Sequence, residues 1–174
     1  MRKIFLALLL SLTSLFCSAQ ITRNIWGLEL GESTKQQVLN VLKQKGFNPT
    51  TDDATSTISV KSDNFKYGGG FWTYASFEFY DGRLYEVWFQ NNEYEIPIAI
   101  FEQFNLIRDR LDKKYSQYRH TETEENSENQ RDYFDGKTRF WLNRRYYNSV
   151  GYISITYSDD KLLNQKLESE KDEL

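Results

Sequence analysis

Few residues of this chain have the types and spacings that catalytic sites need. His120 is the only histidine, and no serine or cysteine motif accompanies it as a partner for a general base. Gly68-Gly69-Gly70 lacks the Lys-Ser/Thr that follows the glycines of a phosphate-binding loop. No His, Cys or carboxylate residues cluster at the spacing of a zinc site. The sequence therefore predicts no cofactor and no metal, and it favours a protein that is not an enzyme.

Carboxylates leave one catalytic alternative open. The chain has 25 acidic residues, so many pairs exist, and the sequence marks none of them as the pair of a glycosidase. Glu124-Glu125 and Asp159-Asp160 are typical of solvated loop acids. A hydrolase whose carboxylates cannot be identified from the sequence remains an alternative.

Aromatic residues are the most unusual part of the composition, at 16% of the chain. Rigid rings bury a large area at low entropy cost, which suits binding surfaces, but the same rings can fill a core that lacks cysteine and methionine. Two adjacent arginines beside tyrosines could also form a small anion or partner patch. The candidate binding residues are Trp72, Tyr74, Tyr80 and Tyr85 of one predicted hairpin, and Arg144 and Arg145 of another.

The N-terminus predicts export. Residues 1–19 begin with Arg2 and Lys3, continue as an apolar run and end in small residues, which is the pattern of a secretory signal peptide cleaved after Ala19. The run is too short to span a bilayer of about 30 Å. Cleavage leaves 20 basic and 25 acidic residues, a net charge of −5, which argues against a partner that is nucleic acid.

Two features leave other locations open. Cys17 would be the site of a lipid anchor, although Phe16 stands where a small residue is expected before such a cysteine. The C-terminal Lys171-Asp172-Glu173-Leu174 has the letters of an ER-retention signal. The favoured location is the periplasm or the outside of the cell, and the domain organisation is a signal peptide (1–19), one domain (20–160) and a charged tail (161–174).

Hydrophobic periodicity predicts two helices. The first covers about 34–45, with Ser33 and Gln36 as a capping box and Gly46 after its end. The second covers about 97–117, where apolar residues recur every three or four positions. The polar stretch from Thr121 to Gln130 is predicted to be a loop.

Two Asp-Gly dipeptides predict hairpins. Asp81-Gly82 joins strands 71–80 and 84–90, and Asp135-Gly136 begins a second hairpin, followed by a final strand at 152–157. Alternation places Trp72, with Tyr74 and Tyr80, on the open face of the sheet. A two-residue turn then pairs Trp88 with Ala75 and places it on the opposite face.

These elements predict an α+β fold: an antiparallel sheet with two helices packed on one face. Each Asp-Gly hairpin follows a helix, which suggests two helix-plus-hairpin units, but chance similarity of the two turns explains the pattern equally well.

The segment from Gly31 to Val38, with Leu42 and Gly46, resembles small envelope modules of the SmpA/OmlA and β-lactamase-inhibitor-protein-like kind. In that kind of module a glycine and a capped helix with an early valine precede antiparallel strands. The resemblance implies protein binding through a concave sheet and assigns no functional residues. The sequence therefore favours an exported protein-binding module of the envelope, with a glycan-binding module using the same rings as the alternative.

We expect processing to leave Gln20 as the first residue of the mature chain, because small residues precede it. Intact-mass measurement of the exported protein tests this, with or without pyroglutamate formation. A diacylglyceryl mass on Cys17 would contradict it.

Overall fold

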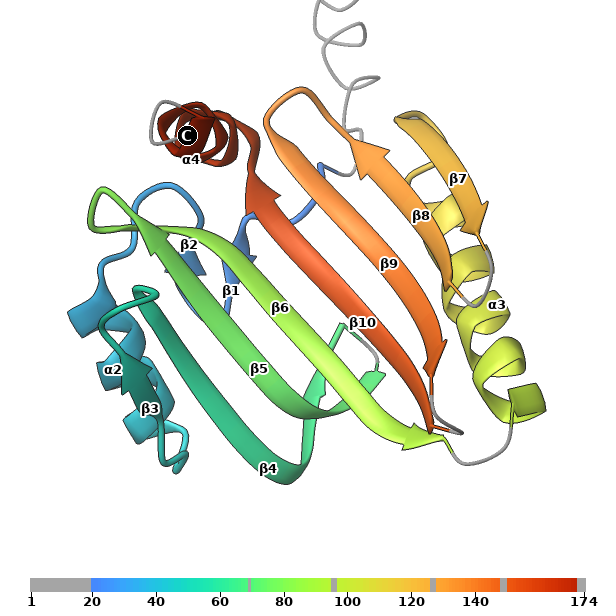
Figure 1. Ribbon diagram of the computed structural model, residues 1–174, viewed down its shortest axis with the longest axis horizontal. Coiled ribbons are helices and arrows are strands. Elements are labelled where there is room, and N and C mark those ends of the chain that lie inside the picture. The colour runs from blue at the N-terminus through green and yellow to red at the C-terminus, as the bar shows by residue number, and fades with distance from the viewer. Residues whose placement is uncertain (1–19, 69, 95–96, 126–127, 148–149, 172–174) are drawn as a thin grey trace, which may run out of the picture.

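The computed structural model describes residues 20–171, apart from 69, 95–96, 126–127 and 148–149. The predicted signal peptide, Cys17 and the last three residues lie outside this part of the chain. The fold is α+β: an eight-stranded antiparallel sheet in the order β3-β4-β5-β6-β10-β9-β8-β7, a separate two-stranded hairpin and three described helices. Each half of the sheet follows one helix in the chain, and the halves meet where β6 pairs with β10 (Figure 1).

The first half comprises the small hairpin β1 (Asn24–Ile25) and β2 (Leu28–Glu29), helix α2 (Lys35–Gln44), and strands β3 (Thr50–Asp52), β4 (Thr57–Tyr67), β5 (Gly70–Tyr80) and β6 (Arg83–Tyr94). The second half comprises helix α3 (Pro97–Lys114), strands β7 (Arg119–Glu125), β8 (Glu128–Phe134), β9 (Thr138–Tyr147) and β10 (Val150–Asp159), and the C-terminal helix α4 (Asp160–Lys171).

One face of the sheet carries the core. The strand register aligns Ile58, Phe77, Val87, Tyr157, Phe140 and Tyr133 in a single row across six strands, and every member is at most 4% exposed. Helix α2 contributes Val38 and Leu42 to this core, α3 contributes Ile100 and Phe104, and Tyr115 joins them directly after the end of α3. In Figure 1 both helices and the β1–β2 hairpin lie behind the sheet, on the side away from the viewer.

The helices begin close to where the sequence predicts. The capping box of α2 uses Thr34 rather than the predicted Ser33: the Thr34 side chain accepts from the Gln37 backbone N–H, while Gln37 Oε1 accepts from the Thr34 backbone N–H at 2.8 Å. Ser33 is buried instead and accepts from the Glu29 N–H at 2.8 Å. The capping box therefore begins one residue later than predicted, because the Ser33 hydroxyl already accepts a hydrogen bond within the preceding turn.

The predicted hairpin through Asp81 and Gly82 is confirmed. Both residues have positive φ, 48° and 71°, as a type I′ turn requires, and Tyr80 pairs with Arg83 across it. The prediction of a loop from Thr121 to Gln130 is wrong, because β7 and β8 form a hairpin there at the edge of the sheet. The Thr and Glu side chains of β7 alternate, which suits an edge strand with both faces in water. The sequence of such a strand has no regularly spaced apolar residues.

The segment predicted as a charged tail also has structure. Asp159 accepts from the Leu162 N–H at 2.9 Å and so caps α4, whose Leu162 is buried. Helix α4 follows β10 directly and lies at one end of the sheet (Figure 1). The Lys166 Nζ of α4 is 5.9 Å from the ring centroid of Tyr85.

We expect Leu42→Ala and Phe104→Ala each to lower the free energy of unfolding by about 2–5 kcal/mol, because both side chains are almost fully buried under the sheet. Urea unfolding followed by tryptophan fluorescence measures the loss. Leu106→Ala is the matched control, since Leu106 is 46% exposed on α3. Losses below about 0.5 kcal/mol at Leu42 and Phe104 would contradict the assignment of the buried face.

Candidate functional site

The candidate site is the face of the sheet that lies opposite α2 and α3, which we call the open face. Register places Ser76, Trp88, Thr156, Trp141 and Asp132 in one row across β5, β6, β10, β9 and β8. The neighbouring row holds Tyr74, Gln90, Ser154, Asn143 and Gln130. Apart from Ser76, which is buried, these side chains are partly exposed.

The open face combines rings with uncharged polar groups. Tyr74 and Trp88 pack edge to face with their ring centroids 5.4 Å apart, and Thr156 lies between Trp88 and Trp141 in the register. Hydroxyl and amide groups can donate or accept hydrogen bonds, and the rings offer apolar contact area. Such a surface can bind a polar ligand or a partner chain without forming a strongly charged interface.

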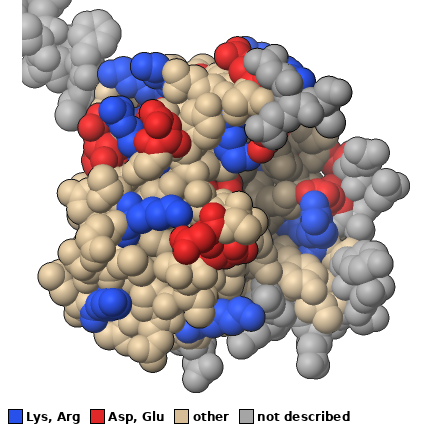
Figure 2. Space-filling model, turned by 60° about the vertical axis from the view of Figure 1, so that its left-hand side comes forward, with Lys and Arg blue, Asp and Glu red and all other residues tan. Residues whose placement is uncertain are grey.

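The surface charge adds no strong field. Figure 2 shows acidic and basic side chains interspersed over the side of the molecule that it presents, without a large patch of one sign. Arg145 and Glu128 form a bidentate ion pair at 2.9 Å between neighbouring strands at the edge of the open face. The side of the molecule shown in Figure 2 therefore exerts only weak long-range electrostatic steering on a charged partner.

The prediction that Trp72 lies on the open face is wrong. Trp72 is 3% exposed, its Nε1 donates to the Tyr67 carbonyl at 2.9 Å, and its ring packs near Phe89 in the core. The β4–β5 pairing is irregular opposite the segment from Trp72 to Tyr74, and the regular pairing of β5 with β6 begins only at Tyr74, so Trp72 lies beyond the regularly paired part of β5. Gly70 makes the inward turn possible, because a Cβ there would lie 2.9 Å from the Trp72 ring.

The face predicted for Trp88 is also wrong, because the pairing of β5 with β6 is irregular. The β5–β6 pairing shifts between Glu78 and Phe79, which leaves Tyr85 as an extra residue in β6. This bulge pairs Trp88 with Ser76 rather than Ala75 and so turns Trp88 to the open face. Tyr85 is buried, with its hydroxyl donating to Glu78 Oε2 at 2.6 Å.

The remaining predicted residues are divided between the two faces. Tyr74 lies on the open face, and Tyr80 is partly buried beside the Asp81–Gly82 turn. Arg144 and Arg145 are neighbours in β9 and point to opposite faces, so they do not form the predicted common patch. Arg144 is 3% exposed on the side of α3, whereas Arg145 is exposed. Sequence reasoning missed Trp88 and Trp141 as open-face residues, and only the position of the bulge could have revealed Trp88.

An acidic pair lies at the end of the open face next to α4. Glu78 and Glu86 are directly opposite in the β5–β6 register, and Glu86 Oε2 accepts from the Ser158 hydroxyl at 2.6 Å. Burial, together with the nearby Glu78 carboxylate, raises the pKa of Glu86 to about 7, although the Ser158 hydrogen bond and Lys166 act in the other direction. Lys166 itself is ion-paired with Glu170.

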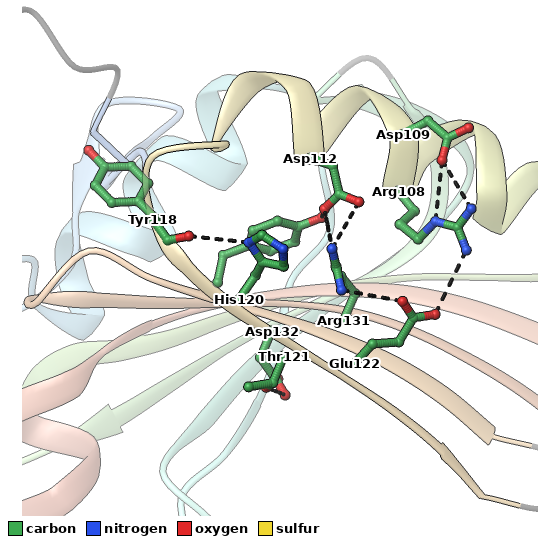
Figure 3. Close-up of polar contacts among 10 residues, drawn as sticks. Arg108, Asp109, Asp112, Tyr118, His120, Thr121, Glu122, Arg131 and Asp132 are labelled. Atoms are coloured by element: carbon green, nitrogen blue, oxygen red, sulfur yellow. Dashed lines mark hydrogen bonds and ion pairs between the residues drawn. The ribbon is translucent and has the colours of Figure 1, made fainter.

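A second polar cluster joins the edge hairpin to α3 (Figure 3). Arg131 donates from Nη2 to both oxygens of Asp112 at 3.0 Å and pairs with Glu122 at 3.3 Å, and the Tyr133 hydroxyl donates to Asp112 at 2.6 Å. His120 Nδ1 lies 3.2 Å from the carbonyl oxygen of Tyr118 and faces no nucleophile among the residues drawn. This cluster is self-satisfied, so it fits a structural role.

No known relative guides the assignment. Comparison of the chain with protein-family models, with curated proteins and with solved structures gives no match. Over the described residues, no group of three or more His, Cys, Asp or Glu side chains is arranged to hold a metal ion. None of the described helices has the length and apolar character needed to cross a bilayer.

We expect Glu86 to make stability depend on pH. Its ordinary pKa of 4.5 applies to the unfolded chain, so the folded protein binds more protons between about pH 4.5 and 7 and loses stability as the pH rises through this range. Relative to wild type, Glu86→Gln should gain up to about 3 kcal/mol of unfolding free energy between pH 5 and pH 8.

Urea unfolding at both pH values measures this gain, and Glu102→Gln, at an exposed position of α3, is the control. A stability difference between wild type and Glu86→Gln that stays constant with pH would show that Glu86 titrates normally.

Proposed function

We propose that this chain is an exported, non-enzymatic module that binds a protein partner in the cell envelope through the open face of its sheet. The observation that carries the proposal is the partly exposed ring and amide surface built around Tyr74, Trp88 and Trp141. The buried core lies on the other face of the sheet, and these three rings are not part of it. The signal peptide predicted at residues 1–19 supports the envelope location.

The proposal includes an internal pseudo-symmetry. Each half of the molecule is a helix followed by four antiparallel strands, and the two central strands, β6 and β10, join the halves into one sheet. The two Asp-Gly turns do not coincide in these units, because Asp81-Gly82 joins the third and fourth strands of the first half and Asp135-Gly136 joins the second and third strands of the second half. The arrangement also agrees with the resemblance of the first helix to small envelope modules that bind proteins through a sheet.

The chemistry of the open face favours an anchored interface rather than an electrostatic one. Tryptophan and tyrosine dominate binding energy at protein interfaces because they bury a large, rigid area. The surrounding Ser154, Asn143 and Gln130 can satisfy polar groups of a partner backbone. We therefore place Trp88 and Trp141 at the centre of the proposed interface.

We expect Trp88→Ala to weaken binding of the partner by about 2 kcal/mol or more, roughly 30-fold, while lowering stability by less than about 1 kcal/mol. Trp72→Ala should instead act on stability and lower the free energy of unfolding by about 3–5 kcal/mol, because Trp72 is buried. Binding is measured by biolayer interferometry against the captured partner, and stability by urea unfolding.

The partner is first captured from envelope extract by quantitative mass spectrometry with three baits: wild type, the Trp88→Ala/Trp141→Ala double variant and Leu106→Ala. Leu106 is an exposed apolar residue of α3, on the other side of the sheet. A partner must be retained by wild type and Leu106→Ala and lost by the double variant. Equal capture by all three baits would refute the open face as the interface.

The same surface gives one specific reason to keep glycan binding as the second candidate. The row beside Trp88 and Trp141 is entirely made of hydroxyl and amide side chains, the groups that bind sugar hydroxyls, and the indole rings could stack on sugar rings. A glycan array probed with wild type and the double variant distinguishes the candidates. Binding to a glycan that the double variant loses, with no protein captured, would replace the protein-binding proposal.

A further inference from the structure

Two arginines on the core side of the sheet lie under α3 in very different surroundings. Arg131 of β8 pairs with two carboxylates, Asp112 and Glu122, as Figure 3 shows. Arg144 of β9 lies one row further along the same face, where it pairs in register with Asn129. Within the described part of the chain, Arg144 forms no ion pair and its buried Nε has no hydrogen-bond partner.

The contacts of Arg144 are aromatic. Its guanidinium carbon lies 3.5 Å from the ring centroid of Phe101 and 5.8 Å from that of Phe104. A cation–π contact of this kind contributes about 0.5–2 kcal/mol, whereas removing a charge from water without an ionic partner costs several kcal/mol. Burial lowers the pKa of Arg144, but a guanidinium stays charged in proteins. Among the described residues, the fold therefore holds this guanidinium without an ion pair and with its buried Nε lacking a hydrogen-bond partner.

Neighbouring groups reinforce the need for an anion. Asn129, opposite Arg144, is 6% exposed and its Oδ1 also lacks a hydrogen-bond partner; its amide could be reversed to present the donor instead. Helix α3 begins at Pro97 and has no acidic residue in its first turn, so the positive end of its dipole adds to the charge of Arg144. The field of Glu124, an exposed residue of β7, acts on Arg144 without forming an ion pair.

The rim of this region is apolar. Phe101, whose ring covers the guanidinium, is 46% exposed, and Ile98 in the first turn of α3 is 65% exposed. Rotation of the Phe101 ring toward solvent would uncover Arg144 without emptying the core. An apolar rim next to a single buried cation suits a ligand with one negative charge and an apolar chain better than a multiply charged anion.

We propose that Arg144, Asn129 and the N-terminal turns of α3 bind the carboxylate of a fatty-acid-like ligand, with its chain lying along Phe101 and Ile98. The guanidinium offers paired N–H donors in the geometry that a carboxylate accepts. This site is on the face of the sheet opposite the proposed protein interface, so either proposal can fail without the other.

The probe is dodecanoate below its critical micelle concentration, added to the purified protein and followed by isothermal titration calorimetry and thermal unfolding. We expect saturable binding and a Tm that rises with dodecanoate concentration, because a ligand that binds only the folded state stabilises it. Arg144→Met should weaken binding at least 10-fold and leave the Tm of the free protein unchanged or higher. Arg144→Lys, which keeps the charge, should retain part of the response.

Arg145→Met is the matched control, since Arg145 is the next residue of the same strand and faces the other side. It should bind dodecanoate as wild type does. Inorganic phosphate tests a negative charge without an alkyl chain, and dodecyltrimethylammonium tests the alkyl chain without a negative charge. Neither compound should shift the Tm of the protein.

Four results would overturn the proposal: no binding to wild type, equal binding to Arg144→Met, an equal response to dodecyltrimethylammonium, or saturable binding of phosphate alone. A large fall in the Tm of free Arg144→Met, with no dodecanoate effect on Arg144→Lys, would instead assign Arg144 a purely structural role.

Discussion

The pairing of β6 with β10 is the constraint on which the rest of the molecule depends. It joins the two halves of the sheet, and it aligns Val87 with Tyr157 and Phe89 with Ile155 on the buried face. Because side chains alternate along a strand, a slip of one residue would exchange the buried and open faces of one whole half. The core under α2 and α3 and the open face with its tryptophans are therefore two results of the same register.

The end of the sheet near α4 depends on one buried carboxylate. Asp159 accepts from Arg23 at 2.5 Å through one oxygen and caps α4 through the other. Arg23 also donates to the Leu30 carbonyl at 2.6 Å, which holds the β1–β2 hairpin against the end of β10. The Arg23–Asp159 pair thus links the N-terminal hairpin, the last strand and the C-terminal helix, and Glu29 is a second ion-pair partner of Arg23 at 3.6 Å.

The sequence predicted the helices and hairpins better than it predicted which face of the sheet each side chain occupies. Asp81-Gly82 predicts its hairpin because only a few residues accept positive φ at both turn positions, and that information is local. The bulge at Tyr85 has no such local signal, since it arises where the burial of Tyr85 and its bond to Glu78 favour an extra residue. One inserted residue then reverses the face predicted for Trp88, and Trp72 lies beyond the regularly paired part of β5, where alternation no longer predicts its face. The β7–β8 hairpin was missed because an edge hairpin with charged faces has no apolar period.

The contrast between the two buried arginines separates what folding explains from what it leaves unexplained. Arg131, Asp112, Tyr133 and Glu122 satisfy one another, so their burial is accounted for within the chain. Strand β9, which pairs with β8, places Arg144 under the same helix α3, where it contacts aromatic rings and forms no ion pair with the described residues. Similarly, the rings of the open face are partly exposed and lie outside the buried core on the other face. In both places the fold positions groups whose interactions are incomplete, and an external ligand is the simplest physical means of completing them.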